Sequence, residues 1–318
     1  MLMSQQNLIS VIIPLRNEAG NLKALQSALD KATEGLPYHF EYLYIDDGST
    51  DNSASILGSL QKANPSVRLI QLARNFGKEI ATTAGLHAAK GEAAIMIDAD
   101  LQHPPELIPE FIKRWEAGDD VVIGKQKPDA AYASFTKRLS ARWFYKIMNR
   151  ISNTEVTPHA TDFRLLDRAV IDEFNKFTER SRLTRGLIDW LGFSRSYIEF
   201  TPARRLHGER SYSYRQLVRL AANSIISLSF FPLRIAGYLG ALIVLVSTPL
   251  ILFIMGNRIF FGNSMKFTGS ATLAAMLLFL IGIVLICQGL MALYVANIYG
   301  EVQNRPLYVE KRPRGARK

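Results

Sequence analysis

The chain has 318 residues, and its 38 Lys and Arg against 28 Asp and Glu give a formal net charge of +10. This length allows one large domain or a domain with an appendage, and the single cysteine, Cys287, excludes an intramolecular disulfide. No basic stripe interleaved with aromatic residues is present, which argues against nucleic acid, so we expect the positive charge to meet anionic lipid and anionic substrate.

The first half of the chain alternates apolar runs with amphipathic stretches. The predicted strands lie in 8–15, 40–49, 67–72, 93–98 and 120–125, and the predicted helices in 18–34, 52–63, 78–89 and 104–118. Strands that alternate with helices predict an α/β fold, with a mostly parallel sheet covered by helices on both faces. In such sheets, ligands bind beyond the carboxyl ends of the strands.

Each of the first four predicted strands ends in polar or charged residues. These ends are Arg16-Asn17-Glu18, Asp46-Asp47-Gly48-Ser49, Arg74-Asn75-Phe76-Gly77 and Asp98-Ala99-Asp100. Any one of them could be an ordinary solvated loop, but four at one sheet edge indicate a binding site. The paired carboxylates of Asp98 and Asp100 suit Mg²⁺ or Mn²⁺, which are bound by oxygen ligands and substrate phosphates. The sequence has no phosphate loop, dinucleotide fingerprint or zinc-ligand spacing.

The second half of the chain changes in character. Residues 130–212 are rich in arginine and are predicted to be more helical. The segment 212–234 mixes arginines with apolar residues and is typical of an amphipathic helix on a membrane surface. The alternative is a helix packed on the soluble domain.

Two long stretches without charge, 235–257 and 267–300, follow. Each exceeds the roughly 20 apolar residues that cross a bilayer, so we predict transmembrane helices at about 235–257 and 268–298; the alternative is a pair of buried core helices. We expect the basic tail to be cytoplasmic, and two spans would return the large N-terminal domain to the same side. The predicted segments are a domain at 1–211, an amphipathic helix at 212–233, two spans within 234–300 and a basic cytoplasmic tail at 301–318.

Five motifs give the sequence a family resemblance. VIIPLRNEAGNL, YIDDGSTDNS, LARNFGKE, DADLQHPPE and TDFRLLDR, in that order, resemble glycosyltransferase family 2. They are most similar to its polyisoprenyl-phosphate glycosyltransferases, such as dolichyl-phosphate mannose synthase and the bactoprenol glucosyltransferases, and the ending NRPLY resembles the bactoprenol branch. The resemblance covers nearly the whole chain. It implies a GT-A fold, a nucleotide-sugar donor and a divalent cation, Mg²⁺ or Mn²⁺.

The resemblance also assigns residues to the donor and the metal. The implied donor-binding residues are Pro14, Arg16, Glu18, Ile45, Asp47, Asp98, Ala99, Lys125 and Arg205. Among them, Glu18 is expected to hold the ribose and Asp47 to lie near the base. The implied metal ligands are Asp98, Asp100 and Gln102. The chain departs from the family pattern at His103, where relatives often carry Asp, and at Ser211, where many carry a phosphate-binding lysine.

The implied acceptor is a polyprenyl phosphate, whose nucleophile is a phosphate oxygen. With a second pKa of about 6, it is largely ionised at neutral pH and has no essential proton to lose. The catalytic candidates are Asp100, Asp162 and Arg164. We expect Asp162, the usual base position of hydroxyl-transferring relatives, to orient the acceptor or Arg164, or to contact the metal or sugar; the alternative is a helix cap. Guanidinium groups clamp phosphate well. The candidates for the acceptor phosphate are Arg164, Arg204, Arg205 and Arg210.

The resemblance therefore implies an inverting transfer of a sugar from a nucleotide donor to undecaprenyl or another polyprenyl phosphate. UDP-glucose is the first expectation, with N-acetylglucosamine or GDP-mannose donors as alternatives. We expect a multi-pass protein of the bacterial inner membrane, a homo-oligomer such as a tetramer, and a separate flippase and downstream glycosyltransferase. A processive polysaccharide synthase is disfavoured because no Q-x-x-R-W motif is present, and a catalytically silent membrane scaffold is disfavoured because the acidic edge is intact.

Overall fold

The computed structural model describes residues 7–127, 159–180, 182–201, 249 and 269–311. The chain divides into two compact units. The first comprises Met1–Arg150, Thr154–Ser211 and Arg305–Lys318, and the second comprises Ile151–Asn153 and Tyr212–Asn304.

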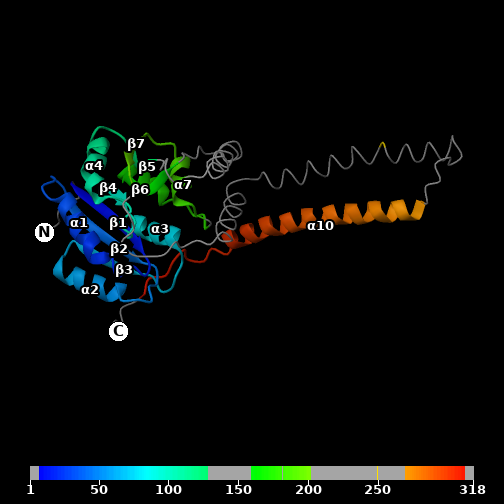
Figure 1. Ribbon diagram of the computed structural model, residues 1–318, viewed down its shortest axis with the longest axis horizontal. Coiled ribbons are helices and arrows are strands. Elements are labelled where there is room, and N and C mark those ends of the chain that lie inside the picture. The colour runs from blue at the N-terminus through cyan, green and yellow to red at the C-terminus, as the bar shows by residue number, and fades with distance from the viewer. Residues whose placement is uncertain (1–6, 128–158, 181, 202–248, 250–268, 312–318) are drawn as a thin grey trace. The chain divides into compact units, whose positions relative to one another are not determined.

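The described part of the first unit contains a seven-stranded sheet in the order β3-β2-β1-β4-β6-β5-β7 (Figure 1). Its strands are β1 (Leu8–Leu15), β2 (His39–Asp46), β3 (Val67–Gln71), β4 (Ala93–Met96), β5 (Val121–Gln126), β6 (Ala160–Asp167) and β7 (Arg195–Phe200). The first four strands are parallel to one another, β6 runs antiparallel to both β4 and β5, and β7 is parallel to β5. This confirms the predicted α/β fold with a mostly parallel sheet.

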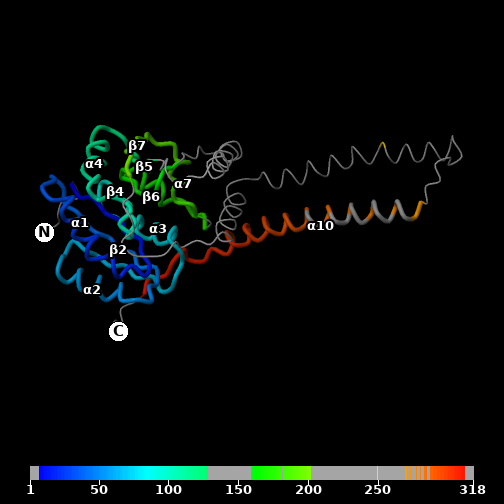
Figure 2. The backbone as a smooth tube through the Cα atoms, in the orientation of Figure 1, coloured from blue at the N-terminus to red at the C-terminus, as the bar shows by residue number. Residues whose placement is uncertain are grey.

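Helices cover both faces of this sheet, as predicted (Figure 2). One face packs against α1 (Leu22–Thr33), α2 (Ser53–Ala63) and α4 (Ile108–Glu116). The other face packs against α3 (Lys78–Ala88), α6 (Arg168–Phe174) and α7 (Thr184–Trp190). A short 3-10 turn, η1 (Pro105–Leu107), precedes α4. Because side chains alternate along a strand, β1 places Ile9, Val11 and Ile13 in the first core and Ile12 in the second. All four residues are fully buried.

The expectation that 130–212 is more helical holds only in part where the structure describes it, because the strands β6 and β7 accompany the helices α6 and α7. A short apolar run such as the FRLL of β6 does not distinguish strand from helix by periodicity. Asp162 lies inside β6, so its reading as a helix cap is wrong. The cap of α6 is Asp167, whose carboxylate accepts a hydrogen bond from the Ala169 N–H at 2.8 Å.

The C-terminal segment 305–311 pairs with the edge strand β3 within the first unit. Glu310 forms an antiparallel bridge with Leu72, just beyond β3. The Lys311 N–H donates to the Gln71 carbonyl at 2.7 Å. An edge strand exposes unpaired backbone groups, so this segment covers part of that edge. The sequence predicted a basic tail here, but not this pairing.

The second unit contains α10 (Gly269–Val302), which spans the second predicted transmembrane segment. Within the described residues, no helix meets the combination of length and apolarity needed to cross a membrane. The predicted amphipathic helix at 212–233 lies outside the described residues, as does the first predicted span apart from residue 249. The two spans therefore stay predictions.

Candidate active site

The loops that follow β1 and β2 are joined by hydrogen bonds at the carboxyl edge of the sheet. The Asn17 N–H donates to the Ser49 hydroxyl at 2.9 Å, and the Thr50 N–H donates to the Asn17 side-chain oxygen at 2.8 Å. The Glu18 N–H donates to the Ser53 hydroxyl at 3.1 Å. The two loops predicted to bind the donor therefore form one connected surface.

The loop after β3 is fixed to the end of β2 by Asp47. This buried carboxylate accepts hydrogen bonds from the N–H groups of Phe76 at 2.7 Å and Gly77 at 2.9 Å. Burial raises the pKa of Asp47, and the two backbone donors counteract part of that effect. Gly48 has a φ of 66°, and a Cβ there would lie 2.6 Å from the backbone carbonyl carbon of Arg74. Glycine is therefore required where these two loops meet.

The other predicted donor residues differ in their exposure. Arg16 is exposed, and Glu18 is half-buried and accepts a hydrogen bond from the Asn21 amide at 2.7 Å. Ile45 is fully buried in the core beside α3, and Ala99 is 3% exposed. Neither of these two side chains presents a substantial surface to a ligand.

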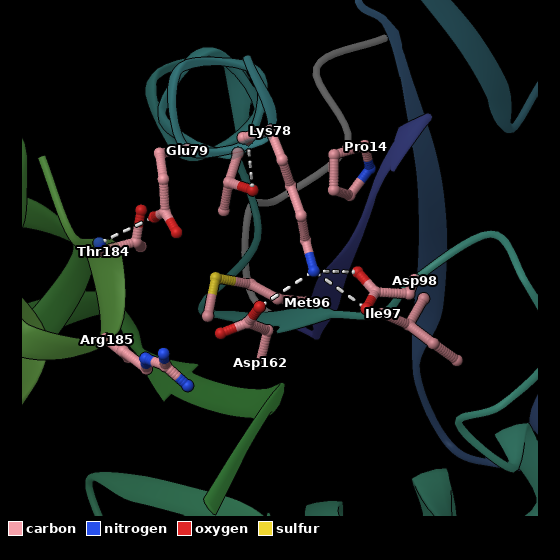
Figure 3. Close-up of a pocket in the computed structure, with 10 residues that line it drawn as sticks. Pro14, Lys78, Glu79, Met96, Ile97, Asp98, Asp162, Thr184 and Arg185 are labelled. Carbon is pink, nitrogen blue, oxygen red and sulfur yellow. Dashed lines mark hydrogen bonds and ion pairs between the residues drawn. The ribbon is translucent and has the colours of Figure 1, made fainter. Parts of the chain in front are cut away.

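At the centre of the site, Lys78 joins two carboxylates from different strands (Figure 3). Its Nζ lies 2.7 Å from an oxygen of Asp98, after β4, and 2.8 Å from an oxygen of Asp162, in β6. The antiparallel direction of β6 brings its first residues to the edge where the parallel strands end. Burial alone would raise the pKa of Asp162, but Lys78 holds it below its usual value, with smaller contributions from Arg185 and Arg164. Asp162 is thus an ionised, paired carboxylate.

A pocket of about 310 Å³, part of it open to solvent, surrounds this ion-pair cluster. It is lined by Pro14, Lys78, Glu79, Thr82, Met96, Ile97, Asp98, Asp162, Thr184 and Arg185. The sequence predicted Pro14, Asp98 and Asp162 as site residues but missed Lys78, Thr184 and Arg185. Lys78 follows a polar strand end and begins α3, a position that could have indicated it. No sequence pattern indicated Arg185.

His103 fixes the start of the Asp98–Asp100 loop. Its Nδ1 accepts a hydrogen bond from the Asp98 N–H at 3.2 Å. Its ring stacks on Phe163 with centroids 5.3 Å apart and meets the edge of Phe200 at 5.9 Å. Burial lowers the pKa of His103, which favours the neutral form that an accepting ring nitrogen requires. The departure from the family pattern at this position thus has a physical role.

Arg164 has a different environment from the one predicted. Its side chain is fully buried, and its Nη1 lies 2.9 Å from a carboxylate oxygen of Asp189. Its Nε donates to the Thr161 carbonyl at 3.0 Å. This interior ion pair connects β6 with α7, and Arg164 is not among the residues that line the pocket. A direct contact between Arg164 and a substrate stays a prediction.

The predicted metal ligands lie on one loop. Gln102 donates its backbone N–H to an Asp100 carboxylate oxygen at 3.1 Å. Among the described residues, no group of three or more His, Cys, Asp or Glu side chains is placed to hold a metal ion. Magnesium sites that include substrate phosphates need only one or two protein carboxylates, so Asp98 and Asp100 fit such an ion.

The remaining predicted residues lie in β5 or beyond the described part of the chain. Lys125 is half-buried in β5, where it pairs with Ala160 of β6. Arg204, Arg205 and Arg210 lie outside the described residues, as does Ser211.

Comparisons with known proteins identify the family. The profile described as "Glycosyl transferase family 2" matches residues 10–174. The chain is 36% identical to the SfII prophage-derived bactoprenol glucosyl transferase of Shigella flexneri, covering 96% of this chain and 97% of that protein. It is also 36% identical to an uncharacterized glycosyltransferase of Synechocystis, covering 95% and 94%.

Among solved structures, mannosyl-3-phosphoglycerate synthase from Rubrobacter xylanophilus is similar with a TM-score of 0.50 at 16% identity. The match covers 69% of this chain and 71% of that one, and shows a shared fold. Together with the sequence matches, this supports a GT-A-like α/β fold with a mostly parallel sheet. The chain belongs to glycosyltransferase family 2.

Proposed function

We propose that this protein transfers a sugar, with glucose as the first candidate, from a UDP-sugar to a polyprenyl phosphate such as undecaprenyl phosphate. Relatives named bactoprenol glucosyl transferase match it over nearly their full lengths, which supports this acceptor class. The observation that carries the proposal is the state of Asp162. By the family resemblance, this carboxylate corresponds to the usual base position of hydroxyl-transferring relatives, and here it is paired with Lys78. Such a pair suits an acceptor that has no proton to give up.

In the proposed reaction, an oxygen of the acceptor phosphate attacks the anomeric carbon of the donor sugar. The bond from that carbon to the donor diphosphate breaks, and the nucleoside diphosphate leaves with the bonding electrons. The product is a sugar joined to the lipid through one phosphate, with inverted anomeric configuration. No proton transfer is required, because the attacking oxygen is already ionised at neutral pH.

The protein's part in this reaction is to position two anionic groups. Glu18, with the loops joined through Asn17 and Ser49, would hold the nucleoside end of the donor at the ends of β1 and β2. Asp98, Asp100 and Gln102 would hold Mg²⁺ or Mn²⁺, which when bound neutralises charge on the leaving diphosphate.

We further propose that residues 212–233 lie on the membrane surface and that the stretches at 235–257 and 268–298 cross it. The second of these spans is supported by α10, which exposes large apolar side chains: Leu273, Leu277, Val284, Met291, Val295 and Ile298. Apolar surface of this kind requires lipid or a protein partner. The catalytic domain would then face the cytoplasm of a bacterial inner membrane.

The sequence supports a limited role for the two proposed spans. They carry none of the buried acids or bases typical of a transport path, so export of the glycolipid would require a separate flippase. A downstream glycosyltransferase would then use the exported sugar. A homo-oligomer, with a tetramer as the first expectation, is part of the same proposal.

The test combines the purified full-length protein with undecaprenyl phosphate, Mg²⁺ or Mn²⁺, and labelled UDP-glucose, UDP-N-acetylglucosamine or GDP-mannose. Undecaprenol, which lacks the phosphate, serves as the matched acceptor. We expect one of the three donors to label the lipid fraction when undecaprenyl phosphate is the acceptor, and no label when undecaprenol replaces it. Absence of transfer from every donor would overturn the proposal, and equal transfer to the alcohol would overturn the claim that no base is needed.

A further inference from the structure

Two cationic side chains from different helices line the same pocket (Figure 3). Lys78 comes from the first turn of α3, and Arg185 comes from the first turn of α7. Lys78 is neutralised by Asp98 and Asp162, at 2.7 and 2.8 Å. Within the described part of the chain, Arg185 has no carboxylate within 4.0 Å and no side-chain hydrogen bond. Its guanidinium acts on Asp162 only through longer-range attraction and is not held in a direct ion pair with any carboxylate that the structure describes.

Besides these two cations, the pocket is lined by Thr184, whose buried hydroxyl has no hydrogen-bond partner among the described residues. Thr184 is 4% exposed, and its hydroxyl forms no hydrogen bond. Buried hydroxyls are usually paired, so this one has a hydrogen bond to offer a molecule that enters the pocket. The Thr184 backbone N–H, in contrast, donates to a carboxylate oxygen of Glu79 at 2.8 Å. This hydrogen bond fixes the start of α7 against α3. It also gives a partner to Glu79, the acidic lining residue that is not paired with Lys78.

We propose that Arg185, Lys78 and the Thr184 hydroxyl form a binding subsite for a phosphomonoester, the headgroup of the acceptor lipid. This inference rests on the proposed function, because it names the part of the same pocket that would receive the acceptor. A guanidinium binds phosphate through two parallel hydrogen bonds, the Lys78 ammonium, already paired with Asp98 and Asp162, adds an N–H donor, and a hydroxyl donates one further bond. The three groups supply the donors that an ionised phosphate requires.

The place of the pocket agrees with a headgroup. Asp98 belongs to both this lining and the strand end predicted to face the donor diphosphate. A phosphate beside Arg185 would thus lie next to the sugar that it attacks.

The experiment measures ligand binding to the full-length protein by calorimetry, without sugar transfer. The ligands are a short prenyl phosphate, the prenyl alcohol of equal length, inorganic phosphate and UDP with Mg²⁺. The key variant is Arg185→Gln, with Arg185→Lys as the charge-preserving variant. Arg114→Gln on α4 is the matched control, because that exposed arginine is not part of the pocket lining.

We expect Arg185→Gln to weaken prenyl phosphate binding roughly tenfold or more, because a charge-assisted hydrogen bond is lost. Arg185→Lys should lose less, UDP binding should change less than about twofold, and Arg114→Gln should change neither. The prenyl alcohol should not bind. Weakened UDP binding with unchanged prenyl phosphate binding would place Arg185 on the donor side and overturn the inference. Inorganic phosphate that binds as tightly as the prenyl phosphate would overturn the assignment to a lipid headgroup.

Thr184→Val tests the subsite independently of Arg185. This change removes the unpaired hydroxyl at nearly constant volume, so the melting temperature should not fall, while prenyl phosphate binding weakens several-fold. Tight binding in both Arg185→Gln and Thr184→Val, in a protein that still transfers sugar, would reject the subsite and leave the proposed function standing. Wild-type protein that binds prenyl phosphate through Arg185 but transfers no sugar would reject the proposed function and leave the subsite standing.

Discussion

His103→Phe tests whether the hydrogen bond from the Asp98 N–H to His103 fixes the loop that carries the paired acids. Phenylalanine keeps an aromatic ring against Phe163 and Phe200 but removes the Nδ1 acceptor. Leaving a partly buried N–H without its acceptor costs about 1–2 kcal/mol, the lower part of the range for unsatisfied buried groups. For a domain of this size, that corresponds to a melting temperature lower by about 2–8 °C.

His103→Asn is the complementary change. The side-chain oxygen of asparagine is bonded to Cγ, as Nδ1 is in histidine, so it can accept the same hydrogen bond. The carboxylate oxygen of the aspartate expected in many relatives has the same position. The ring contacts with Phe163 and Phe200 are lost, and a cavity remains. We therefore expect His103→Asn to be the less stable variant, by about 2–4 kcal/mol relative to wild type. It should nevertheless keep a donor KM closer to wild type than His103→Phe does.

The assays are thermal unfolding of the full-length protein in detergent and the KM for the nucleotide sugar. His103→Phe should raise the donor KM, because the Asp98–Asp100 loop is no longer fixed at its start. A His103→Phe protein with wild-type melting temperature and wild-type donor KM would refute the reasoning. The same applies if His103→Asn disturbs the donor KM more than His103→Phe does.

Three further changes test other parts of the structure. Asp162→Asn should slow transfer without removing a limb of the pH–rate profile between about pH 6 and 8, because Lys78 lowers the pKa of Asp162 and so favours its ionised form. Loss of an acid limb would identify Asp162 as the base. Gly48→Ala should weaken UDP binding, because Gly48 has a φ of 66° and a Cβ there would lie 2.6 Å from a backbone atom of Arg74. Gly35→Ala, at a φ of 76° in open space, should cost only about 1–2 kcal/mol of stability. Equal effects of the two variants on UDP binding would contradict the loop contact. Lys311→Pro removes the N–H that donates to the Gln71 carbonyl of β3 and should lower the free energy of unfolding by about 0.5–1.5 kcal/mol. Lys311→Ala keeps that hydrogen bond and serves as the control. Equal melting temperatures of the two variants would show that the pairing does not stabilise the protein.

The first half of the fold was predictable because its signals are local. Strand β1 was predicted with the observed bounds, Leu8–Leu15, since eight consecutive mostly apolar residues end at a charged turn. Parallel strands then place their carboxyl ends at one edge, so Asp47 and Asp98 could be assigned to a site before any contact was known. Helix α1 begins at Leu22 rather than at the predicted Glu18, because the residues between them form a loop whose Glu18 N–H bonds to Ser53, the first residue of α2.

The centre of the site was not predictable, because it depends on contacts between distant segments. Lys78 and Asp162 are 84 residues apart, and they meet because β6 runs antiparallel between β4 and β5. His87 and Tyr308 are 221 residues apart, and their side chains lie 3.3 Å apart because the C-terminal segment returns to β3. Neither contact leaves a periodic signal in the sequence.

The central claim, sugar transfer to the phosphate of a polyprenyl lipid, is tested most directly by mass spectrometry of the lipid product. Purified protein is incubated with undecaprenyl phosphate and the donor that supports transfer, and the lipid is extracted. We predict one sugar residue, of the mass that this donor supplies, joined through a single phosphate, with nucleoside diphosphate released in equal amount. A lipid carrying two phosphates, or no sugar-bearing lipid with any donor, would contradict the account.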